Sequence, residues 1–441
     1  MPPLPRPDGR RLVTDSPTKF AGPGGPVPRS SLRGDWTFGI YLVGDAASLI
    51  GTSVHAVALP VLAVLHLQAT PAQVAHLYLL IQAPNFVMAL PAGALADRYA
   101  PKTLLIATDL AAAGLVAAVP AAALAGTLSM PLLYVVAVFL GAVTVLHHAA
   151  ASAILPKLVA PALLHQAISR QEAILGAAST AGTYLGTAVV ALTGAAWAFA
   201  LDSISYLVSA WCTSRIPGHP SPSARERPTR LTTEVWEGIL YVARDPLLRP
   251  LALCMAGTGV GAGVIAVFSG WYLLTVLQTG PTGLGLIMGM SGAGYLVGAL
   301  VSPRLVGRFG PGTVLIASVA VYPLMEVPLL LADPGPLWLV ILSLAGALQL
   351  AAAACATATV RTVRQQMCPP SFQARVQQTS VWFVGGSRPL AALAAGALAA
   401  AVGVWATLLT GALVLVATAL ALWASPVRHR ADMPTAVGRG Q

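Results

Sequence analysis

The chain has 441 residues, of which 56% are hydrophobic and only 9% are charged, and its mean hydropathy is +0.75. Soluble proteins normally carry about a quarter charged residues, so this composition excludes a soluble globular protein and predicts a polytopic membrane protein. The four cysteines are scattered without a C-x-x-C pair, and therefore indicate neither a disulfide framework nor a metal site.

Residues 1–35 are rich in Pro, Gly, Ser and Arg and have no apolar periodicity, which predicts a disordered tail. From residue 36 onward, long apolar runs alternate with short polar breaks. A helix needs about 20 apolar residues to cross a bilayer, and backbone groups in lipid must be satisfied within the segment, so we interpret the runs as helices. The expected spans are 38–66, 72–95, 103–125, 131–155, 164–192, 194–213, 249–276, 282–303, 312–332, 336–362, 376–401 and 403–424.

A longer break over residues 213–246 separates the sixth span from the seventh. Its second half, TTEVWEGILYVARD, has an amphipathic pattern that predicts a short interfacial helix. We therefore expect an all-α membrane protein of two pseudo-symmetric six-helix bundles. Its parts are an N-terminal tail (1–35), a first bundle (36–213), a central linker (214–247), a second bundle (248–424) and a C-terminal tail (425–441).

The placement of charge supports twelve spans. In this arrangement 24 of the 25 Lys and Arg residues fall on one side of the membrane. The positive-inside rule then places both tails and the linker in the cytoplasm of a cell that carries the protein in its plasma or inner membrane. The net charge of +10 is thus a signal of topology, and we expect no nucleic-acid partner.

The two halves repeat a motif. LPAGALADRYAPKTLL (90–105) follows the second span and VGALVSPRLVGRFGPGTVLI (297–316) follows the eighth. Repeated halves are typical of transporters whose substrate site lies at the interface of the repeats.

GALADRYAPK resembles the loop signature of the major facilitator superfamily, G-x-L-a-D-r-x-G-r-[RK]. Its matching residues are Gly93, Leu95, Asp97, Arg98 and Lys102, while alanine and proline replace the family's glycine and first basic residue at 100 and 101. The resemblance implies a gate in which Asp97 caps the N-terminus of the eleventh span, where a carboxylate is favourable.

Three segments resemble the efflux branch that includes enterobactin exporters and macrolide-efflux-type proteins. They are LVGDAASLIG, FALDSISYLVSA and RVQQTSVWFVGGSRPLAALAAG. The resemblance implies export of a hydrophobic or amphipathic small molecule such as an antibiotic, secondary metabolite or siderophore, by alternating access powered by the proton gradient. GTYLGT in the fifth span lacks the proline of the family's antiporter signature, which weakens the inference of antiport. Uptake or facilitated diffusion, and a transport-inactive sensor or scaffold, are the alternatives.

Asp45 and Arg388 are charged residues within apolar spans, where an unpaired charge is costly. Asp45 is either a proton or substrate site or a structural hydrogen-bonding group. Arg388 has a similar expected depth in the other half, so we consider an ion pair between them.

Three further residues are candidates for the cavity. Glu326 lies in the middle of the ninth span, where a buried hydrogen bond is the simpler interpretation, and Asp202 has the same interpretation in the sixth. His147 and His148 lie in the fourth span, and since neighbours on a helix differ by about 100°, at most one points centrally. Asp109 is expected to pair with Arg98 or Lys102.

The chain has no phosphate-binding G-x-x-x-x-G-K-[ST] loop, no nucleophile–base pair and no spacing of metal ligands. We therefore expect a non-enzymatic protein without a cofactor, which works as a monomer with the lipid bilayer and a small-molecule substrate as its partners.

Overall fold

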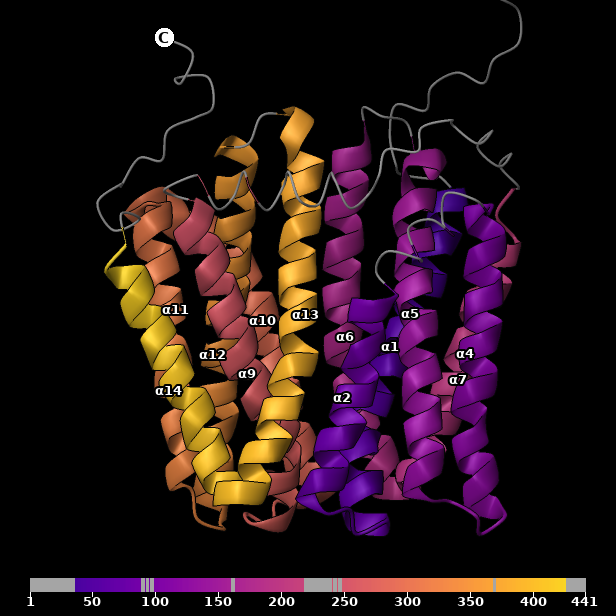
Figure 1. Cartoon of the computed structure of the whole chain (residues 1–441). Coiled ribbons are helices and arrows are strands. Elements are labelled where there is room, and N and C mark those ends of the chain that lie inside the picture. Colours follow the sequence, from indigo (N-terminus) through magenta and orange to yellow (C-terminus); the bar gives the residue numbers. More distant parts are fainter. Residues whose placement is uncertain are drawn as a thin grey trace, which may run out of the picture.

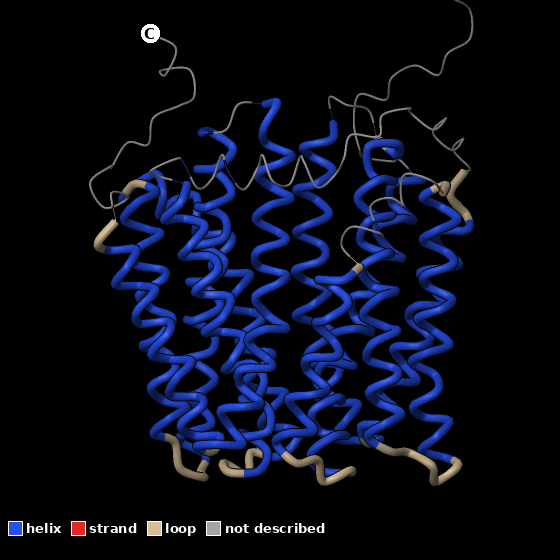
Figure 2. Tube along the Cα trace, viewed as in Figure 1, coloured by secondary structure: helices blue, strands red, loops and turns tan. Residues whose placement is uncertain are grey.

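The computed structural model describes residues 36–88, 92, 95, 99–159, 163–217, 240, 244, 248–367 and 370–425. Within these ranges the regular structure is entirely helical, and the helices stand roughly parallel to one another (Figures 1 and 2). The first half contains α1 (Trp36–Val61) with a π-helical turn η1 (Leu62–His66), α2 (Pro71–Val87), α4 (Pro101–Leu124), α5 (Met130–Leu158), α6 (Leu164–Thr193) and α7 (Ala195–Ser214). The second half contains α9 (Leu248–Thr275), α10 (Gly280–Phe309), α11 (Pro311–Leu331), α12 (Pro336–Met367), α13 (Pro370–Val402) and α14 (Val404–Trp423).

The predicted all-α fold is confirmed, and each described helix coincides with one predicted span. Ten of these helices are long and apolar enough to cross a membrane, and α13 contains a shorter apolar helix, Gly386–Val402. α10 continues to Phe309 instead of 303, α13 begins at Pro370 instead of 376, and the described helix α2 ends at Val87 instead of 95. The extensions of α10 and α13 each contain arginine. A helix keeps its backbone hydrogen bonds beyond the hydrocarbon core, so hydropathy does not mark its end.

Several predictions fall outside the described residues. These are the N-terminal tail, nearly all of the C-terminal tail, most of the linker with its interfacial helix, and the motif residues Gly93, Asp97 and Arg98.

The two ends of the helices differ in charge. We call the face where α1 begins and α14 ends the terminal face (upper in Figure 1), and the other the opposite face. The described loops of the opposite face, drawn along the lower edge in Figure 2, are 67–70, 125–129, 276–279 and 332–335, and they contain no Lys or Arg. This agrees with the charge asymmetry expected from the sequence.

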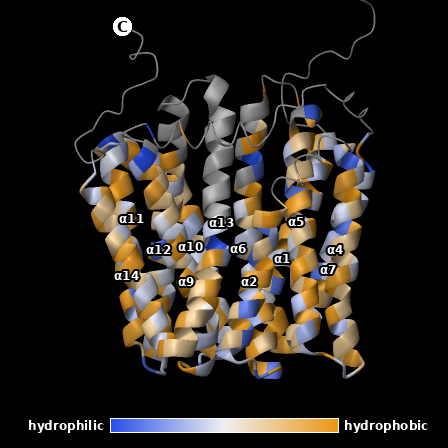
Figure 3. Cartoon of the chain, in the orientation of Figure 1, coloured by the Kyte–Doolittle hydropathy of each residue, from blue (hydrophilic) through white to orange (hydrophobic). Residues whose placement is uncertain are grey.

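Large apolar side chains are exposed on the helices, and Figure 3 shows hydrophobic colour on many of their turns. Leu124 is 74% exposed and Leu192 is 84% exposed. Apolar exposure on this scale indicates a surface that lipid covers.

The helices pack mainly within each half of the chain. In the first half α1 packs on α6 and α7, and α4 packs on α5 and α7. In the second half α10 packs on α12, and α9 packs on α14 and α13. The main contacts between the halves are α2 with α13 and α6 with α10. The fold thus consists of two six-helix groups that meet along two seams.

Small residues allow the closest of these approaches. A Cβ atom at Gly294 of α10 would lie 2.6 Å from the Cα atom of Ala347 in α12, so no larger residue fits there without moving the backbone. Close packing of this kind is typical of membrane helices, which associate through van der Waals contact at small residues.

Candidate functional site: a cavity between the halves

A cavity of about 810 Å³ lies between the two halves. Helices α1, α2, α5 and α7 form its wall on one side, and α9, α10, α11 and α12 form it on the other. In α1, which starts at the terminal face, the first lining residue is Thr52, 16 residues after the start of the helix. In α10, which starts at the opposite face, the last lining residue is Ser291, 11 residues after the start. The cavity therefore lies in the half of the molecule nearer the opposite face.

Most of the wall is aliphatic or aromatic. Its polar side chains are Thr52, His55, Tyr78, Gln82, Asn85, Thr144, Tyr206, Ser269, Ser291, Tyr322, Glu326 and Gln349. A largely apolar wall with a few separated polar groups is the usual form of a small-molecule site.

Contacts between the halves bound the cavity towards the opposite face. Pro60 of α1 lies beside Gly270 of α9, where a Cβ atom would be 3.4 Å from the Pro60 Cβ. Gly396 of α13 similarly faces Ala75 of α2 at 3.1 Å. The two halves thus touch at two points between the cavity and that face.

Glu326 lies in the cavity wall, as the sequence suggested. Gln349 of α12 donates a hydrogen bond from Nε2 to Glu326 Oε1, and the glutamate residue is only 7% exposed. The buried hydrogen bond and the cavity position thus occur together. A role in binding protons or substrate stays a prediction.

A histidine–aspartate pair that sequence reasoning missed lies across the cavity from Glu326. His55 Nδ1 of α1 lies 2.9 Å from Asp202 Oδ2 of α7. His55 lines the cavity, whereas Asp202 is fully buried. The sequence predicts that Asp202 is a buried hydrogen-bonding residue, and the signal for its partner is a second titratable residue in an apolar span, His55.

Asp45 does not reach the cavity. It lies ten residues before His55, about 15 Å along the helix towards the terminal face. Gln171 of α6 donates a hydrogen bond from Nε2 to Asp45 Oδ2 at 2.8 Å, and contacts the Tyr41 hydroxyl at 3.3 Å. Asp45 therefore has a hydrogen-bonding partner within its own half, and a role in binding protons or substrate stays a prediction.

The proposed pair between Asp45 and Arg388 is not formed between these two described side chains. Arg388 is exposed and lies 18 residues after the start of α13, roughly 27 Å along that helix, whereas Asp45 lies roughly 14 Å from the start of α1. The sequence predicts similar depths for the two residues because it places the start of the eleventh span at 376, whereas α13 begins at Pro370. Arg388 is not part of the cavity wall either.

The two histidines of α5 also lie outside the wall. His147 Nδ1 is 3.1 Å from Asp109 Oδ1 and 3.2 Å from Thr108 Oγ1, so it faces α4. Asp109 is fully buried, and its contact with His147 lacks hydrogen-bond geometry. His148 is exposed.

Lys102 corrects a further expectation, because it does not pair with Asp109. Its ammonium group donates to the backbone carbonyls of Ser214, at 2.9 Å, and Ile216. These carbonyls lie at the C-terminus of α7, where helix carbonyls lack partners and a cation is favourable. Of the other motif residues, only Leu95 is described, as helical and half-buried.

A sequence profile of the family described as transmembrane secretion effectors matches residues 30–436. The chain is an MFS-type transporter. It is 27% identical over 319 residues to the uncharacterised MFS-type transporter y4rN of Sinorhizobium fredii, covering 71% of this chain and 76% of that one.

Solved transporters share the fold. The nucleoside transporter NupG superposes with a TM-score of 0.69 at 15% identity, covering 88% of this chain and 98% of NupG. A bacterial homologue of the iron transporter ferroportin, in an inward-facing state, gives 0.63 at 15% identity, covering 88% and 99%. The superfamily resemblance is therefore confirmed, and the chain is a transporter rather than an enzyme.

Proposed function

We propose that this MFS-type transporter exports a hydrophobic or amphipathic small molecule by alternating access, driven by the proton gradient. The observation that carries the proposal is the cavity of about 810 Å³ between the halves. Its volume suits a drug-sized molecule. Its apolar wall favours an apolar body, and its separated polar groups favour a ligand that also carries hydrogen-bonding or charged groups.

The direction of transport is proposed from charge and from the efflux-branch segments. The described loops of the opposite face contain no Lys or Arg, which supports a cytoplasmic terminal face. The cavity would then lie in the outer half of the membrane, and contacts between the halves would close it from the exterior. Separation of those contacts would release the substrate outwards.

The gate is proposed to lie on the terminal face at Gly93, Leu95, Asp97, Arg98 and Lys102, from the sequence motif. Lys102 supports this in one respect, because its bonds to the α7 carbonyls fix the start of α4 against the end of α7. Rigid attachment at this corner lets the first half move as a unit.

Transport is tested in two steps. Cells with and without the protein are compared for susceptibility to a panel of amphipathic antibiotics, and each compound that shows protection is then assayed in proteoliposomes with an imposed proton gradient. Ala266→Trp, which fills the cavity from α9, is expected to abolish protection. Leu253→Trp, on the 62% exposed lipid side of the same helix, is the matched control.

The outcomes separate the alternatives. Substrate flux out of the cytoplasmic compartment, in the direction opposite to proton flow, supports export. Substrate flux into that compartment establishes uptake. Protection that Ala266→Trp leaves unchanged contradicts the cavity as the site. An absence of both protection and flux across the panel contradicts the proposal.

A further inference from the structure

We infer that His55, held by Asp202, is the group in the cavity that exchanges a proton during transport. This inference rests on the proposed proton-driven export and assigns its coupling site. It replaces the candidates in the sequence that carried charge but lie away from the cavity, above all Asp45.

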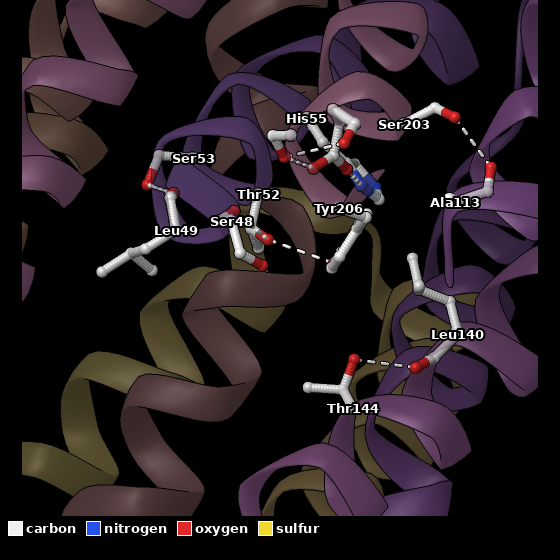
Figure 4. Close-up of polar contacts among 12 residues, drawn as sticks. Ser48, Leu49, Thr52, Ser53, His55, Ala113, Leu140, Thr144, Ser203 and Tyr206 are labelled. Atoms are coloured by element: carbon white, nitrogen blue, oxygen red, sulfur yellow. Dashed lines mark hydrogen bonds and ion pairs between the residues drawn. The ribbon is translucent and has the colours of Figure 1, made fainter. Parts of the chain in front are cut away.

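The pair combines a buried carboxylate with an accessible imidazole. Asp202 is 0% exposed, and the side chain of His55 is 13% exposed and lines the cavity. The imidazole thus lies between the buried carboxylate and the cavity. Figure 4 shows His55 beside Tyr206, with α1 and α7 supplying the groups of this cluster.

The surroundings hold the pair in one geometry. A Cβ atom at Gly51 would lie 2.6 Å from Asp202 Oδ1, so glycine leaves the space that the carboxylate occupies. The Ser205 hydroxyl donates to the backbone carbonyl oxygen of Asp202 at 2.7 Å and to its carboxylate Oδ1 at 3.4 Å, and the centroid of the Phe199 ring lies 4.6 Å from that of the imidazole. A polar pair buried with this support is a built site rather than an incidental contact.

A second bridge lies one turn away and keeps the same two helices together. The hydroxyl groups of Thr52 and Tyr206 are 3.1 Å apart (Figure 4), and both residues line the cavity. The registry of α1 against α7 is thereby fixed at His55 and one turn before it.

The geometry defines where the proton binds. A carboxylate only accepts hydrogen bonds, so Nδ1 carries a hydrogen towards Asp202, and Nε2 keeps a lone pair. Nε2 takes a proton from water in the cavity to form an imidazolium, whose charge Asp202 balances. The pair then passes from a net charge of −1 to zero, and returns to −1 when Nε2 releases the proton to water on the other side.

Several ionisable groups surround the pair. Tyr206 lies on α7, Asp109 lies on α4 packed against α7, and Tyr78, Tyr322 and Glu326 lie across the cavity. Among the described residues of the wall there is no Lys or Arg. Arg388 of α13 lies outside the wall, where its Cα is 3.9 Å from a Cβ atom built at Gly263 of α9, and it acts electrostatically on Tyr78 and Tyr322. Proton binding at His55 changes the net charge of the histidine–aspartate pair from −1 to zero.

Protonation is expected to change the balance between conformations, because a ligand shifts an equilibrium when it binds one state better. This can be measured without a known substrate. Spin labels are placed at Thr127 and Pro334, exposed positions in opposite-face loops of the first and second halves. The buried cysteines Cys212, Cys254 and Cys355 stay in place, and Cys368 is replaced by serine.

The distance distribution of the full chain in nanodiscs is recorded by pulsed EPR between about pH 5.5 and 8.5, the range over which histidine titrates. We expect the ratio of the two main populations to change about tenfold in the parent protein, the size of a typical coupling. His55→Gln and Asp202→Asn should reduce the change to less than about twofold. His76→Gln is the matched control, since this exposed histidine bonds only the Ala72 carbonyl of its own helix.

Each outcome has a separate meaning. A pH response that persists in both His55→Gln and Asp202→Asn overturns the assignment, and a parent protein that does not respond to pH overturns proton coupling through His55 as well. If His55→Gln does not fold, Asp202→Asn decides, because asparagine keeps the volume and a hydrogen-bonding group. Export is tested separately with an antibiotic from the panel. The two variants should lose flux driven by the proton gradient and keep exchange of substrate at equal pH on both sides. A parent protein without any flux contradicts export, but it does not contradict proton exchange at His55.

Discussion

The seam between α6 and α10 predicts that Gly285→Ala shifts the transporter away from the conformation described here. Gly285 lies five residues from the start of α10 at the opposite face, and it contacts Thr187 of α6. A Cβ atom at Gly285 would lie 2.5 Å from the Thr187 Cβ. Rotation of the threonine side chain cannot relieve this overlap, because the Cβ atom is fixed to the backbone.

The size of the effect follows from that distance. Ordinary contacts between such atoms start at 3.4 Å, so the helices must separate by about 1 Å at this point. Overpacking in a well-packed interface costs about 1–3 kcal/mol. The strain acts only in the state in which α6 and α10 touch near the opposite face, and it therefore raises the population with this face open by roughly 5- to 150-fold.

The assay is the distance between spin labels at Thr127 and Pro334, which should lengthen in Gly285→Ala. Gly292→Ala is the matched control on the same seam, since a Cβ atom there would meet Thr180 Oγ1 at an ordinary 3.6 Å. Adding Thr187→Gly to Gly285→Ala should restore the parent distribution. An unchanged distribution in Gly285→Ala, or the same change in Gly292→Ala, would refute the reasoning.

Three further predictions address other parts of the molecule. Glu326→Gln should weaken binding of the cation tetraphenylphosphonium about tenfold, because it removes the carboxylate of the wall, and should leave binding of tetraphenylborate, an anion of similar shape, unchanged. Fluorescence of the lining residue Trp271 reports the binding of both ions. An equal loss of affinity for both ions would contradict this prediction. Lys102→Met should lower the melting temperature, since two charged hydrogen bonds to α7 are worth about 1.5–3 kcal/mol each. Arg304→Met is the control, at an exposed residue whose bond to the Leu300 carbonyl is 3.5 Å long, and it should change the melting temperature little. An equal loss of melting temperature in both variants would show that the two bonds to α7 do not stabilise the protein. Asp97→Asn should cut export in vesicles at an unchanged protein level, and full activity would exclude the gate proposed from the sequence.

Hydropathy and charge determined the helices because a bilayer imposes two strong local requirements. A span must be about 20 apolar residues long, and its basic flanks must stay on one side. The last residues of α10 and the first residues of α13 lie beyond the predicted spans. There the apolar signal stops while the helix continues.

Contacts between distant residues could not be obtained in the same way. The sequence identified Asp45, Arg388, His147, His148 and Glu326 as polar residues in apolar spans, but only Glu326 lies in the wall. The depth of a residue along a helix does not give the direction in which its side chain points. An error of six residues in the predicted start of a helix also changes the predicted depth of every residue in that helix by about 9 Å.

The sequence by itself determined the twelve apolar helices and the absence of Lys and Arg from the described loops of one face, because each of these features is a property of a continuous segment. Only the tertiary structure decided that Gln171 donates a hydrogen bond to Asp45. It alone also decided that His55 contacts Asp202, 147 positions away in the sequence, beside the cavity. The physical reason is that a buried charge is stabilised by whichever partner the packing of the helices brings within about 3 Å. That packing depends on small residues such as Gly51, whose importance appears only when the neighbouring helix is in place.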